Sequence, residues 1–473
     1  MLKQANTKYG LCEGTISEGG YALFKGIPYA APPVGNLRWK PPVEPVPWDG
    51  VRKCDQWGNA ALQKVAFQSR HTGYGKEFYP CGDYPPKTSE DCLYLNIWTP
   101  AQRQDEKLPV MVWLHGGGVQ TGYGHEIEFD GDAYCKRCVI LVTVNYRLNI
   151  FGYFSHPELG KENPYGASGN YGLMDQIQAL KYIRENISAF GGDPDNVTVF
   201  GQSGGGRSTQ AICCSPLAKG LVHHAIVQSA GGIATAAGVR TRQMQEDNGV
   251  AFMKAAGCTD IAQLRALSGE ELLTKFNKYL SQARSFEQHN RMGFNICTDG
   301  YALPDSMEES LVLGKQHDID YMLGTVSGDE RMSSMMASLC GWAEMQNKYN
   351  LKPAYLYCFT RALPQKWYNF GALKGAFHSS ELWYMFGTLN RCWRPMTKDD
   401  YELSEIMLDY WSNFAKTGNP NAQNLPIWTP YTTENKQHMK LDIGSVRLTD
   451  FYQKNSIGQQ IDKLLDNLSA KKS

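Results

Sequence analysis

The feature that most constrains the fold is a strand that runs into a glycine-rich turn at residues 197–207, VTVFGQSGGGR. Its alternating apolar residues predict a strand entering the core, and residues 201–205 then read G-x-S-x-G. A serine on a sharp strand-to-helix turn has a strained backbone, and flanking glycines let neighbouring main chain approach closely. Such a turn places the hydroxyl of Ser203 where a base and a substrate can both reach it. An isolated G-x-S-x-G fits an ordinary loop equally well, because the chain holds 47 glycines.

The rest of the chain alternates apolar strands with helical segments. Near-continuous apolar runs at residues 108–114 and 139–146 predict strands buried on both faces, and residues 172–183 have helical spacing. Further strands are predicted at residues 93–98, 197–200, 221–228, 319–324 and 354–359, with a closing helix at 402–416. This alternation predicts the α/β class, with a large, mostly parallel central sheet and helices on both faces.

Three segments depart from that alternation. Residues 9–60 predict small N-terminal strands and turns, and residues 62–91 predict a long loop. Residues 241–290 are helix-rich and interrupt the sheet pattern, so we expect a helical insertion, or cap, over about 235–315. We expect the whole chain, residues 1–473, to form a single domain.

Composition excludes several classes of function. The chain is 42% hydrophobic and 20% charged, and 47 basic residues balance 47 acidic ones, so we expect no nucleic-acid or membrane partner. No apolar segment resembles a signal peptide or a membrane span, which favours a cytoplasmic location. The 13 cysteines lack zinc-site spacing, Cys135 and Cys138 forming a lone C-x-x-C, and P-loop residues are missing. We therefore expect no metal and no cofactor.

Residues that directly follow buried strands are the candidates for chemistry, because sites in such sheets form beyond the carboxyl ends of the strands. The segment His115 to Gly118 follows one strand, and its consecutive glycines can point backbone N–H groups at one spot. Gly204 supplies another N–H group at the start of a helix. Together these groups predict an oxyanion hole beside Ser203.

A base and an acid should follow Ser203 in the order acid, then histidine. His378 is the best base candidate, because it lies in an irregular segment after the strand at residues 354–359. The segment after residue 324 offers two adjacent carboxylates, Asp329 and Glu330, of which only one can face the histidine. Four other histidines are interpreted as packed or surface residues: His156, His223, His224 and His317.

At these residues the chain resembles a type B carboxylesterase, of the cholinesterase-like branch of the α/β-hydrolases. Matching segments run almost end to end, and several of them in order are highly specific. Besides the serine turn they are FKGIPYA (24–30), LRW (37–39), SEDCLYLNI (89–97), WLHGGG (113–118), VNYRL (144–148), GNYGLMDQ (169–176), FGGDP (190–194), GAFHSSEL (375–382) and WSNFAKTGNP (411–420).

The resemblance implies an α/β-hydrolase fold and a role for each site residue. Ser203 would be the nucleophile and His378 the general base and then acid. For the acid it points to the position five after Gly324, which is Asp329; Glu330, although glutamate is usual in the family, would need a one-residue insertion. The implied oxyanion hole consists of the N–H groups of Gly117, Gly118 and Gly204. Arg38 with Glu90, and Arg147 with Asp175, resemble the buried structural ion pairs of the family.

Departures from the family pattern narrow the expected substrate. Gln202 replaces the usual glutamate before the nucleophile, so the negative charge that favours cationic substrates is missing. Residues 62–91 contain no tryptophan to hold a quaternary ammonium group. Ala61 stands where secreted members have a cysteine to pair with Cys92, so that disulfide should be absent.

We therefore expect a serine esterase that acts through an acyl-enzyme on neutral esters, aromatic ones among them, which includes a feruloyl-esterase-like activity. The expected partner is a small-molecule ester, and the expected state is a monomer or a weak homo-oligomer. Two alternatives stay open: a non-catalytic adhesion or binding protein on the same fold, and an amidase or thioesterase that uses the same residues.

Overall fold

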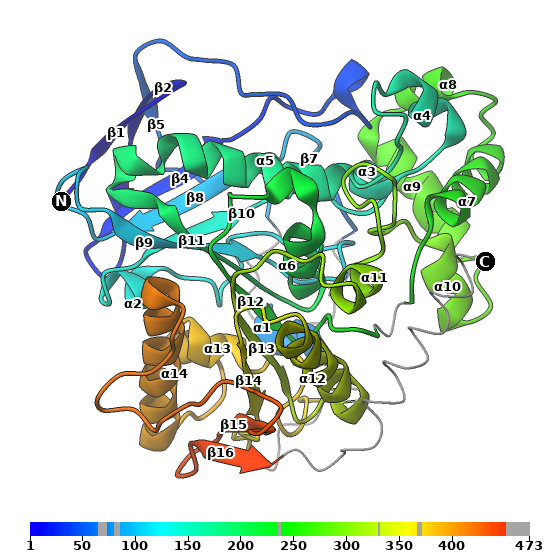
Figure 1. The fold of residues 1–473 in the computed structure, drawn as a ribbon. Helices are drawn as coiled ribbons and strands as arrows, with labels where there is room; N and C mark the ends of the chain where they lie inside the picture. Colours follow the sequence, from blue (N-terminus) through cyan, green and yellow to red (C-terminus); the bar gives the residue numbers. More distant parts are fainter. Residues whose placement is uncertain (65–72, 80–85, 235–237, 330–331, 367–370, 451–473) are drawn as a thin grey trace.

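An eleven-stranded mixed sheet runs through the centre of the molecule (Figure 1). The structure is a computed structural model, and it describes residues 1–64, 73–79, 86–234, 238–329, 332–366 and 371–450. The strands of this sheet, in spatial order, are β16 (Arg447–Asp450), β15 (Gln437–Leu441), β14 (Ala354–Phe359), β13 (Asp320–Val326), β12 (His224–Gln228), β11 (Gly192–Gln202), β9 (Leu108–Leu114), β10 (Ile140–Val144), β8 (Tyr94–Thr99), β4 (Ala22–Pro28) and β3 (Thr15–Ile16).

The middle of the sheet is parallel and its edges are antiparallel. Strands from β10 through β9, β11, β12, β13 and β14 to β15 pair in parallel, whereas β8, β4, β3 and β16 join in antiparallel fashion. Parallel strands need crossovers, which helices supply here. The carboxyl ends of β9, β11, β12 and β13 consequently meet at one edge of the sheet, where a site can form.

Alternate residues of the buried strands belong to two separate cores. In β9, Val110 and Val112 contribute to one hydrophobic cluster, while Met111 and Trp113 contribute to the other. Successive side chains of a strand point to opposite faces, so a run of apolar residues is stable only when both faces are covered. The predicted class, with helices on both faces of a mostly parallel sheet, is confirmed.

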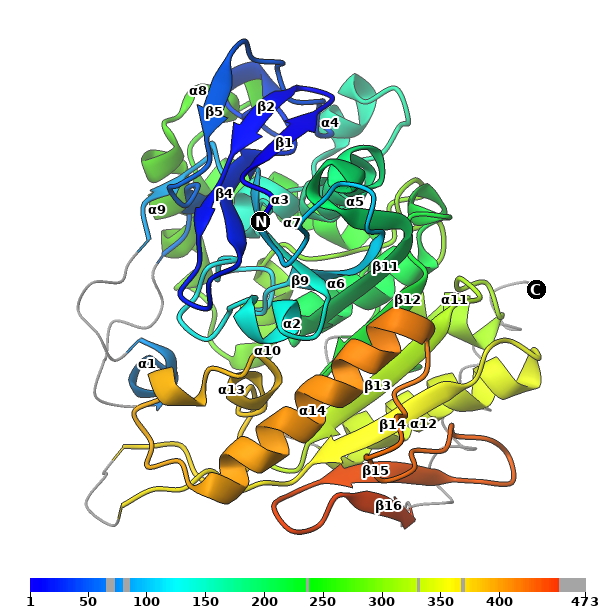
Figure 2. The ribbon, with the colours of Figure 1, turned by 90° about the vertical axis from the view of Figure 1, so that its left-hand side faces the viewer.

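Helices cover both faces. On one face α6 contacts β11 and β12 and α12 contacts β13 and β14; on the other α14 contacts β9 and β11 and α2 contacts β10 (Figures 1 and 2). The helices are α1 (Gly73–Phe78), α2 (Asp132–Cys135), α3 (Asn149–Tyr153), α4 (Pro157–Glu162), α5 (Tyr171–Asn186), α6 (Gly204–Cys214), α7 (Arg242–Ala255), α8 (Ile261–Ala266), α9 (Gly269–Leu280), α10 (Phe286–Met292), α11 (Met307–Val312), α12 (Met332–Lys348), α13 (Leu382–Met385) and α14 (Lys398–Thr417). Short 3-10 turns are η1 (Gly35–Leu37), η2 (Ile187–Phe190), η3 (Pro216–Ala218) and η4 (Leu389–Arg391).

Smaller elements lie at the N-terminal side. Strand β1 (Gln4–Thr7) pairs antiparallel with β2 (Gly10–Glu13), which pairs in parallel with β5 (Val51–Lys53). Residues 62–91, predicted as a loop, include helix α1, and β6 (Ala60–Ala61) pairs with β7 (Thr88–Ser89) across this segment. Helices α7 to α11 lie between β12 and β13 in the chain. The single-domain organisation stays a prediction.

Two buried ion pairs hold the frame together, as the resemblance implied. Arg147 donates to both carboxylate oxygens of Asp175, at 2.7 and 2.6 Å, and both side chains are buried. Arg38 donates to Glu90 at 2.7 and 2.5 Å, and also to the backbone carbonyls of Arg265 and Leu267 near α8. Each arginine therefore links segments that are far apart in the sequence.

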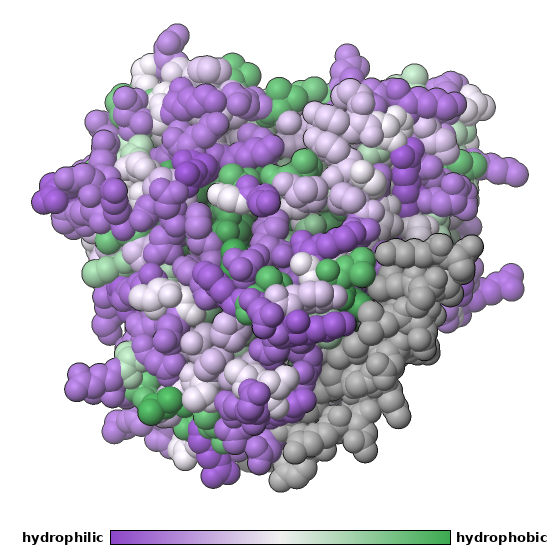
Figure 3. Space-filling view, in the orientation of Figure 1, coloured by the Kyte–Doolittle hydropathy of each residue, from purple (hydrophilic) through white to green (hydrophobic). Residues whose placement is uncertain are grey.

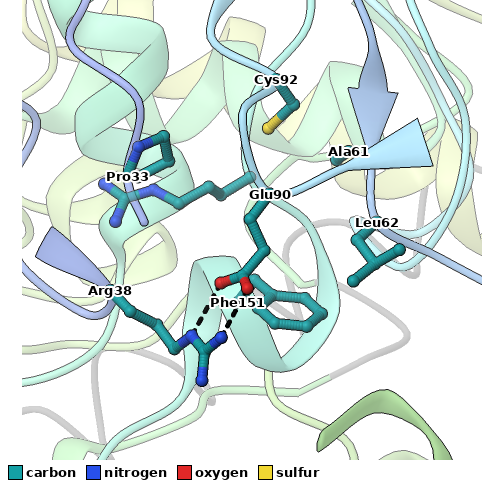
Figure 4. A pocket seen from close by; sticks show the side chains of 8 residues that line it. Pro33, Arg38, Ala61, Leu62, Glu90, Cys92 and Phe151 are labelled. Carbon is teal, nitrogen blue, oxygen red and sulfur yellow. Dashed lines mark hydrogen bonds and ion pairs between the residues drawn. The ribbon is translucent and has the colours of Figure 1, made fainter. Parts of the chain in front are cut away.

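A small pocket surrounds the pair of Arg38 and Glu90, whose charged ends face each other in Figure 4. Cys92 is a buried free thiol here, as expected in the absence of a cysteine at Ala61. The pocket contains neither Ser203 nor His378, so we assign it to the frame. Its lining residues are Pro33, Arg38, Ala61, Leu62, Glu90, Cys92, Arg147 and Phe151.

The face shown in Figure 3 is mostly hydrophilic, and its hydrophobic side chains form small separate groups. Among the helices that the structure describes, none combines the length and the apolar character that crossing a bilayer requires.

Replacement of Asp175 tests the role of the buried ion pair. Asp175→Asn leaves Arg147 charged and buried without a carboxylate, which should lower the free energy of unfolding by about 3–5 kcal/mol. Asp105→Asn is the matched control, because its pair with Arg103 is exposed (73% and 75%) and should contribute at most about 1 kcal/mol. Urea unfolding followed by circular dichroism measures both changes. Equal losses in the two variants would contradict the assignment.

Candidate active site

Ser203 occupies a strained turn between β11 and α6. Its backbone angles are φ 56° and ψ −120°, which a residue with a side chain rarely adopts. The backbone N–H of Ser203 donates to the carbonyl of Gln228 at the end of β12, at 2.9 Å. The residue is partly exposed, so the predicted strand-to-helix turn does present the serine at the edge of the sheet.

Flanking glycines make this turn possible because α6 begins in contact with the strands. A Cβ atom on Gly205 would lie 1.9 Å from the carbonyl oxygen of Leu114 in β9. A Cβ atom on Gly201 would lie 2.5 Å from the carbonyl carbon of Gly205. Any larger residue at either position would push the first turn of α6 away from the sheet.

The glycine loop after β9 lies against the start of α6. Gly117 and Gly118 have φ values of 94° and 63°, in the left-handed region that glycine adopts readily. A Cβ atom built on Gly204 would lie 2.7 Å from the backbone nitrogen of Gly118, so the two main chains touch. The glycines predicted from the sequence are thus brought together beside Ser203.

Buried polar contacts fix both ends of this loop. The hydroxyl of Tyr146 donates to the carbonyl of His115 at 2.8 Å, and the two rings stack. Burial lowers the pKa of His115 to about 4, so this ring is neutral near pH 7. At the other end, Gln63 donates to the carbonyl of Gly122 at 2.9 Å and accepts from its N–H at 2.7 Å.

Asp329 and His378 come together from two loops at the carboxyl end of the sheet. The carboxylate oxygen Oδ1 of Asp329 is hydrogen bonded to Nδ1 of His378. A parallel bridge between Gly328 and Phe377 joins the two loops one residue before each of these side chains, and the N–H of Gly328 donates to Ala376 at 2.9 Å. Glu330, the alternative acid, lies outside the described residues.

The surroundings of Asp329 favour its ionised form. Burial opposes ionisation, but hydrogen bonds from His378 and from the hydroxyl of Thr325 outweigh it and hold the pKa of Asp329 below its ordinary value. The backbone N–H of Val326 also donates to this carboxylate, at 3.3 Å. The carboxylate is therefore charged and can orient an imidazole.

Gln202 contacts the other nitrogen of the His378 ring. The amide nitrogen Nε2 of Gln202 lies 3.3 Å from Nε2 of His378. Because the amide nitrogen donates, this ring nitrogen accepts, and the imidazole proton lies on Nδ1, facing Asp329. Nε2 of His378 is thus held beside the residue directly before Ser203, in the tautomer that a base requires.

Sequence reasoning missed one acid of the site, Glu381. This residue is fully buried, three positions after His378, and neither carboxylate oxygen has a hydrogen-bond partner among the residues described. Burial, together with the negative charge of Asp329, raises the pKa of Glu381 to about 8. Glu381 is therefore largely protonated at pH 7. In the sequence two serines precede it and apolar residues from Leu382 follow it, a pattern that does not single out this glutamate as buried.

The other histidines singled out in the sequence have structural contacts. Nδ1 of His223 accepts from the N–H of Val197, and His224 pairs with Asp320. His317 bonds to the carbonyl of Ser215, and His156 caps α4. Over the described part of the chain, no group of three or more His, Cys, Asp or Glu residues is arranged to hold a metal ion.

Comparisons with known proteins show what the whole chain is similar to. The model of the Carboxylesterase family matches residues 2–339 and 330–459. Para-nitrobenzyl esterase of Bacillus subtilis is 33% identical over 92% of this chain and 94% of its own length. Fumonisin B1 esterase of Sphingopyxis macrogoltabida is 38% identical over 67% of this chain and 55% of its own length. A solved thermophilic PNB esterase superposes with a TM-score of 0.82 at 29% identity, covering 98% of this chain and 100% of that one.

Glu381 should make stability depend on pH. Its pKa is higher in the folded chain (about 8) than the ordinary 4.5, so the folded state binds the extra proton between these values. The contribution of Glu381 to the free energy of unfolding is fully present below pH 4.5. It decreases as the pH rises towards 8, by about 1.4 kcal/mol for each pH unit. The Glu381→Gln variant lacks this loss, so its stability relative to the parent chain should grow over the same range.

Urea unfolding of both proteins at pH 5, 6, 7 and 8 measures the difference. Glu402→Gln is the control, because Glu402 is 60% exposed on α14 and should show no such trend. Parallel stability curves for the parent chain and Glu381→Gln would contradict the assignment.

Proposed function

The chain belongs to the carboxylesterase family and is a carboxylic ester hydrolase, and we propose that it works through an acyl-enzyme formed on Ser203. The observation that carries the proposal is the contact of Asp329 with His378, whose other ring nitrogen lies beside the residue preceding Ser203. An ionised acid, an oriented imidazole and an accessible serine at a strained turn are the parts that nucleophilic acyl transfer needs.

Each step follows from a group at the site. Nε2 of His378 accepts the proton of Ser203 as the serine oxygen bonds to the ester carbonyl carbon, and Asp329 stabilises the resulting imidazolium. His378 then protonates the leaving alcohol as the ester C–O bond breaks. Water repeats the attack on the acyl-serine, with His378 again as the base, and releases the acid and the free serine.

The oxyanion would be bound by main-chain N–H groups. We propose Gly117, Gly118 and Gly204 as the donors, on the basis of the contact between Gly118 and Gly204 next to Ser203. Donors fixed in a rigid backbone need no reorientation when charge develops on the carbonyl oxygen. The anchored ends of the glycine loop support this rigidity.

Gln202 bears on the choice of substrate. As a neutral amide beside Ser203, it provides no negative charge for a cationic alcohol, so choline-type esters are disfavoured. Neutral esters, aromatic ones among them, are the class proposed for the first assays.

Removal of the Ser203 hydroxyl should abolish turnover. Ser203→Ala should lower kcat for 4-nitrophenyl butyrate by about 10⁴-fold or more, because the acyl-enzyme can no longer form. Release of nitrophenol measures the rate, and a fluorescent organophosphonate should label the parent chain but not the variant. Ser281→Ala, at an exposed helix end, is the control. Full activity in Ser203→Ala would refute the serine mechanism.

A charge at position 202 should change the pH profile. Gln202→Glu places a carboxylate where an amide nitrogen lies 3.3 Å from His378, which favours the imidazolium. The pKa of His378 should rise, and the acidic limb of kcat/KM should move up by about one pH unit or more.

Gln202→Met is the matched control for this experiment. It removes the amide without adding charge, so its acidic limb should not move upward. An identical limb in Gln202→Glu and the parent chain would show that His378 is not the group whose titration limits the rate.

A further inference from the structure

Arg207 lies one helical turn after Ser203, and no acidic side chain among the described residues forms an ion pair with it. Its backbone N–H donates to the carbonyl of Ser203 at 3.0 Å. No hydrogen bond or ion pair involves its guanidinium within the described chain, and its Nε atom is buried without a partner. The Arg207 side chain is half-buried, and a partly desolvated charge without a partner needs an explanation.

The helix directs this side chain toward the serine. Cα–Cβ bonds in a helix tilt toward its N-terminus, so a long side chain covers the turn that precedes its own residue. The turn before Arg207 is the one that carries Ser203. Helices α3 and α11 lie beside this part of α6 in Figure 1; the charge of Arg207 acts on Tyr153 of α3, and the charge of Glu308 of α11 acts on Arg207.

Arg240 is a buried arginine near Arg207. Only 8% of it is exposed, its Nε atom has no partner, and its remaining nitrogens donate to the carbonyls of Gly293 (2.8 Å) and Asn290 (2.5 Å). The next residue, Phe294, accepts a 2.7 Å hydrogen bond from Gln120 of the glycine loop. Arg240 therefore sits on the segment that contacts the proposed oxyanion hole.

The two arginines are close enough to influence each other. Burial, together with the positive charge of Arg207, lowers the pKa of Arg240 to about 10. Both guanidinium groups nevertheless stay protonated at neutral pH. A half-buried cation and a buried cation this close repel each other, and a bound anion would relieve this repulsion.

Acids in the neighbourhood are engaged elsewhere. Glu246 pairs with Arg242 at 2.6 Å and accepts from Ser168 at 2.8 Å. Asp299 accepts two backbone N–H groups at 2.9 Å. Glu308 influences Arg207 electrostatically, but no ion pair joins these two described residues. The positive charge beside Ser203 is therefore left for a ligand.

We propose that Arg207, with Arg240 behind it, forms an anion subsite that binds a carboxylate of the substrate. The preferred substrate would then be an ester that carries a second, free carboxylate group. This inference rests on the proposed function and deepens it, because Gln202 only disfavours cations whereas the arginines select anions. The free carboxylate could belong to the acyl part or to the alcohol part, and matched substrates separate these sources.

Two substrate pairs that differ in charge test the proposal. For the acyl part, 4-nitrophenyl hydrogen glutarate is compared with 4-nitrophenyl valerate. For the alcohol part, 4-carboxyphenyl valerate is compared with 4-carbamoylphenyl valerate. We expect kcat/KM to favour the anionic member of at least one pair, and the pair that shows the preference identifies the source. No preference in either pair would overturn the proposal.

Variants of Arg207 assign the preference to this side chain. Arg207→Gln should lower the anionic-to-neutral ratio of kcat/KM by about ten- to a hundredfold, the range expected for one charge-assisted hydrogen bond. Arg207→Lys should retain part of the preference. Arg291→Gln, which removes an exposed charge on α10, should leave the ratio unchanged. If Arg207→Gln lowers kcat/KM equally for the anionic and the neutral member of the preferred pair, Arg207 acts in a step common to both substrates and the proposal is overturned.

A binding measurement keeps this test separate from the proposed function. Glutarate should raise the thermal unfolding temperature of the parent chain and of Ser203→Ala, at matched ionic strength with sodium chloride, but not that of Arg207→Gln. Arg207→Gln without ligand should be about as stable as the parent chain, because it removes a half-buried charge that has no ion-pair partner among the described residues. If glutarate raises the unfolding temperature but no ester is hydrolysed, the acyl-enzyme proposal is contradicted and the anion subsite is supported. If neutral esters are hydrolysed but glutarate does not raise the unfolding temperature, the acyl-enzyme proposal is supported and the anion subsite is contradicted.

Discussion

The left-handed backbone of Ser203 is the constraint on which the rest of the site depends. The turn exists only because Gly201 and Gly205 let α6 start in contact with β9, where a single added carbon would meet a carbonyl oxygen. The same close packing brings Gly204 against the glycine loop. A local backbone strain is thus maintained by the sheet, and it sets the distance between the proposed nucleophile and the proposed oxyanion donors.

Charge is distributed unevenly around this turn. On one side an ionised Asp329 and a mostly protonated Glu381 lie near His378, so one negative charge faces the ring rather than two. On the other side Arg207 is half-buried and Arg240 is buried, and neither forms an ion pair with a carboxylate among the described residues. The frame, in contrast, buries its charges in complete pairs, as Arg147 does with Asp175. The charges of this frame pair are matched, whereas the arginines near Ser203 have no carboxylate partner among the described residues.

Much of the fold was predictable because its strands are apolar on both faces. The bounds of β9 and β14 agree with those predicted, and the other central strands differ by a few residues. Strands β15 and β16 were missed because QHMKL and RLTD lack such a pattern at the edge of the sheet. Helix α1 was missed because GYGKEF is short and begins with a glycine.

The site was predictable where the chemistry follows a strand end. Ser203, Asp329, His378 and the glycines were candidates from the sequence, and the structure brings Asp329 and His378 into contact. The burial of Glu381 and of Arg240 was not predictable, because both residue types are normally exposed and only the packing of distant segments removes them from water. Sequence spacing also gave no indication that Gln202 touches His378, since the contact spans 176 positions.

The central claim is that Ser203, the glycine loop and His378 act as one acyl-transfer site. A crystal structure of the protein inactivated by a phosphonate ester tests it most directly. We expect a bond from phosphorus to Oγ of Ser203, with the phosphonyl oxygen about 2.7–3.1 Å from the backbone nitrogens of Gly117, Gly118 and Gly204. His378 should lie within hydrogen-bonding distance of the adduct. A phosphonate attached to another residue, or a phosphonyl oxygen directed away from these glycines, would contradict the account.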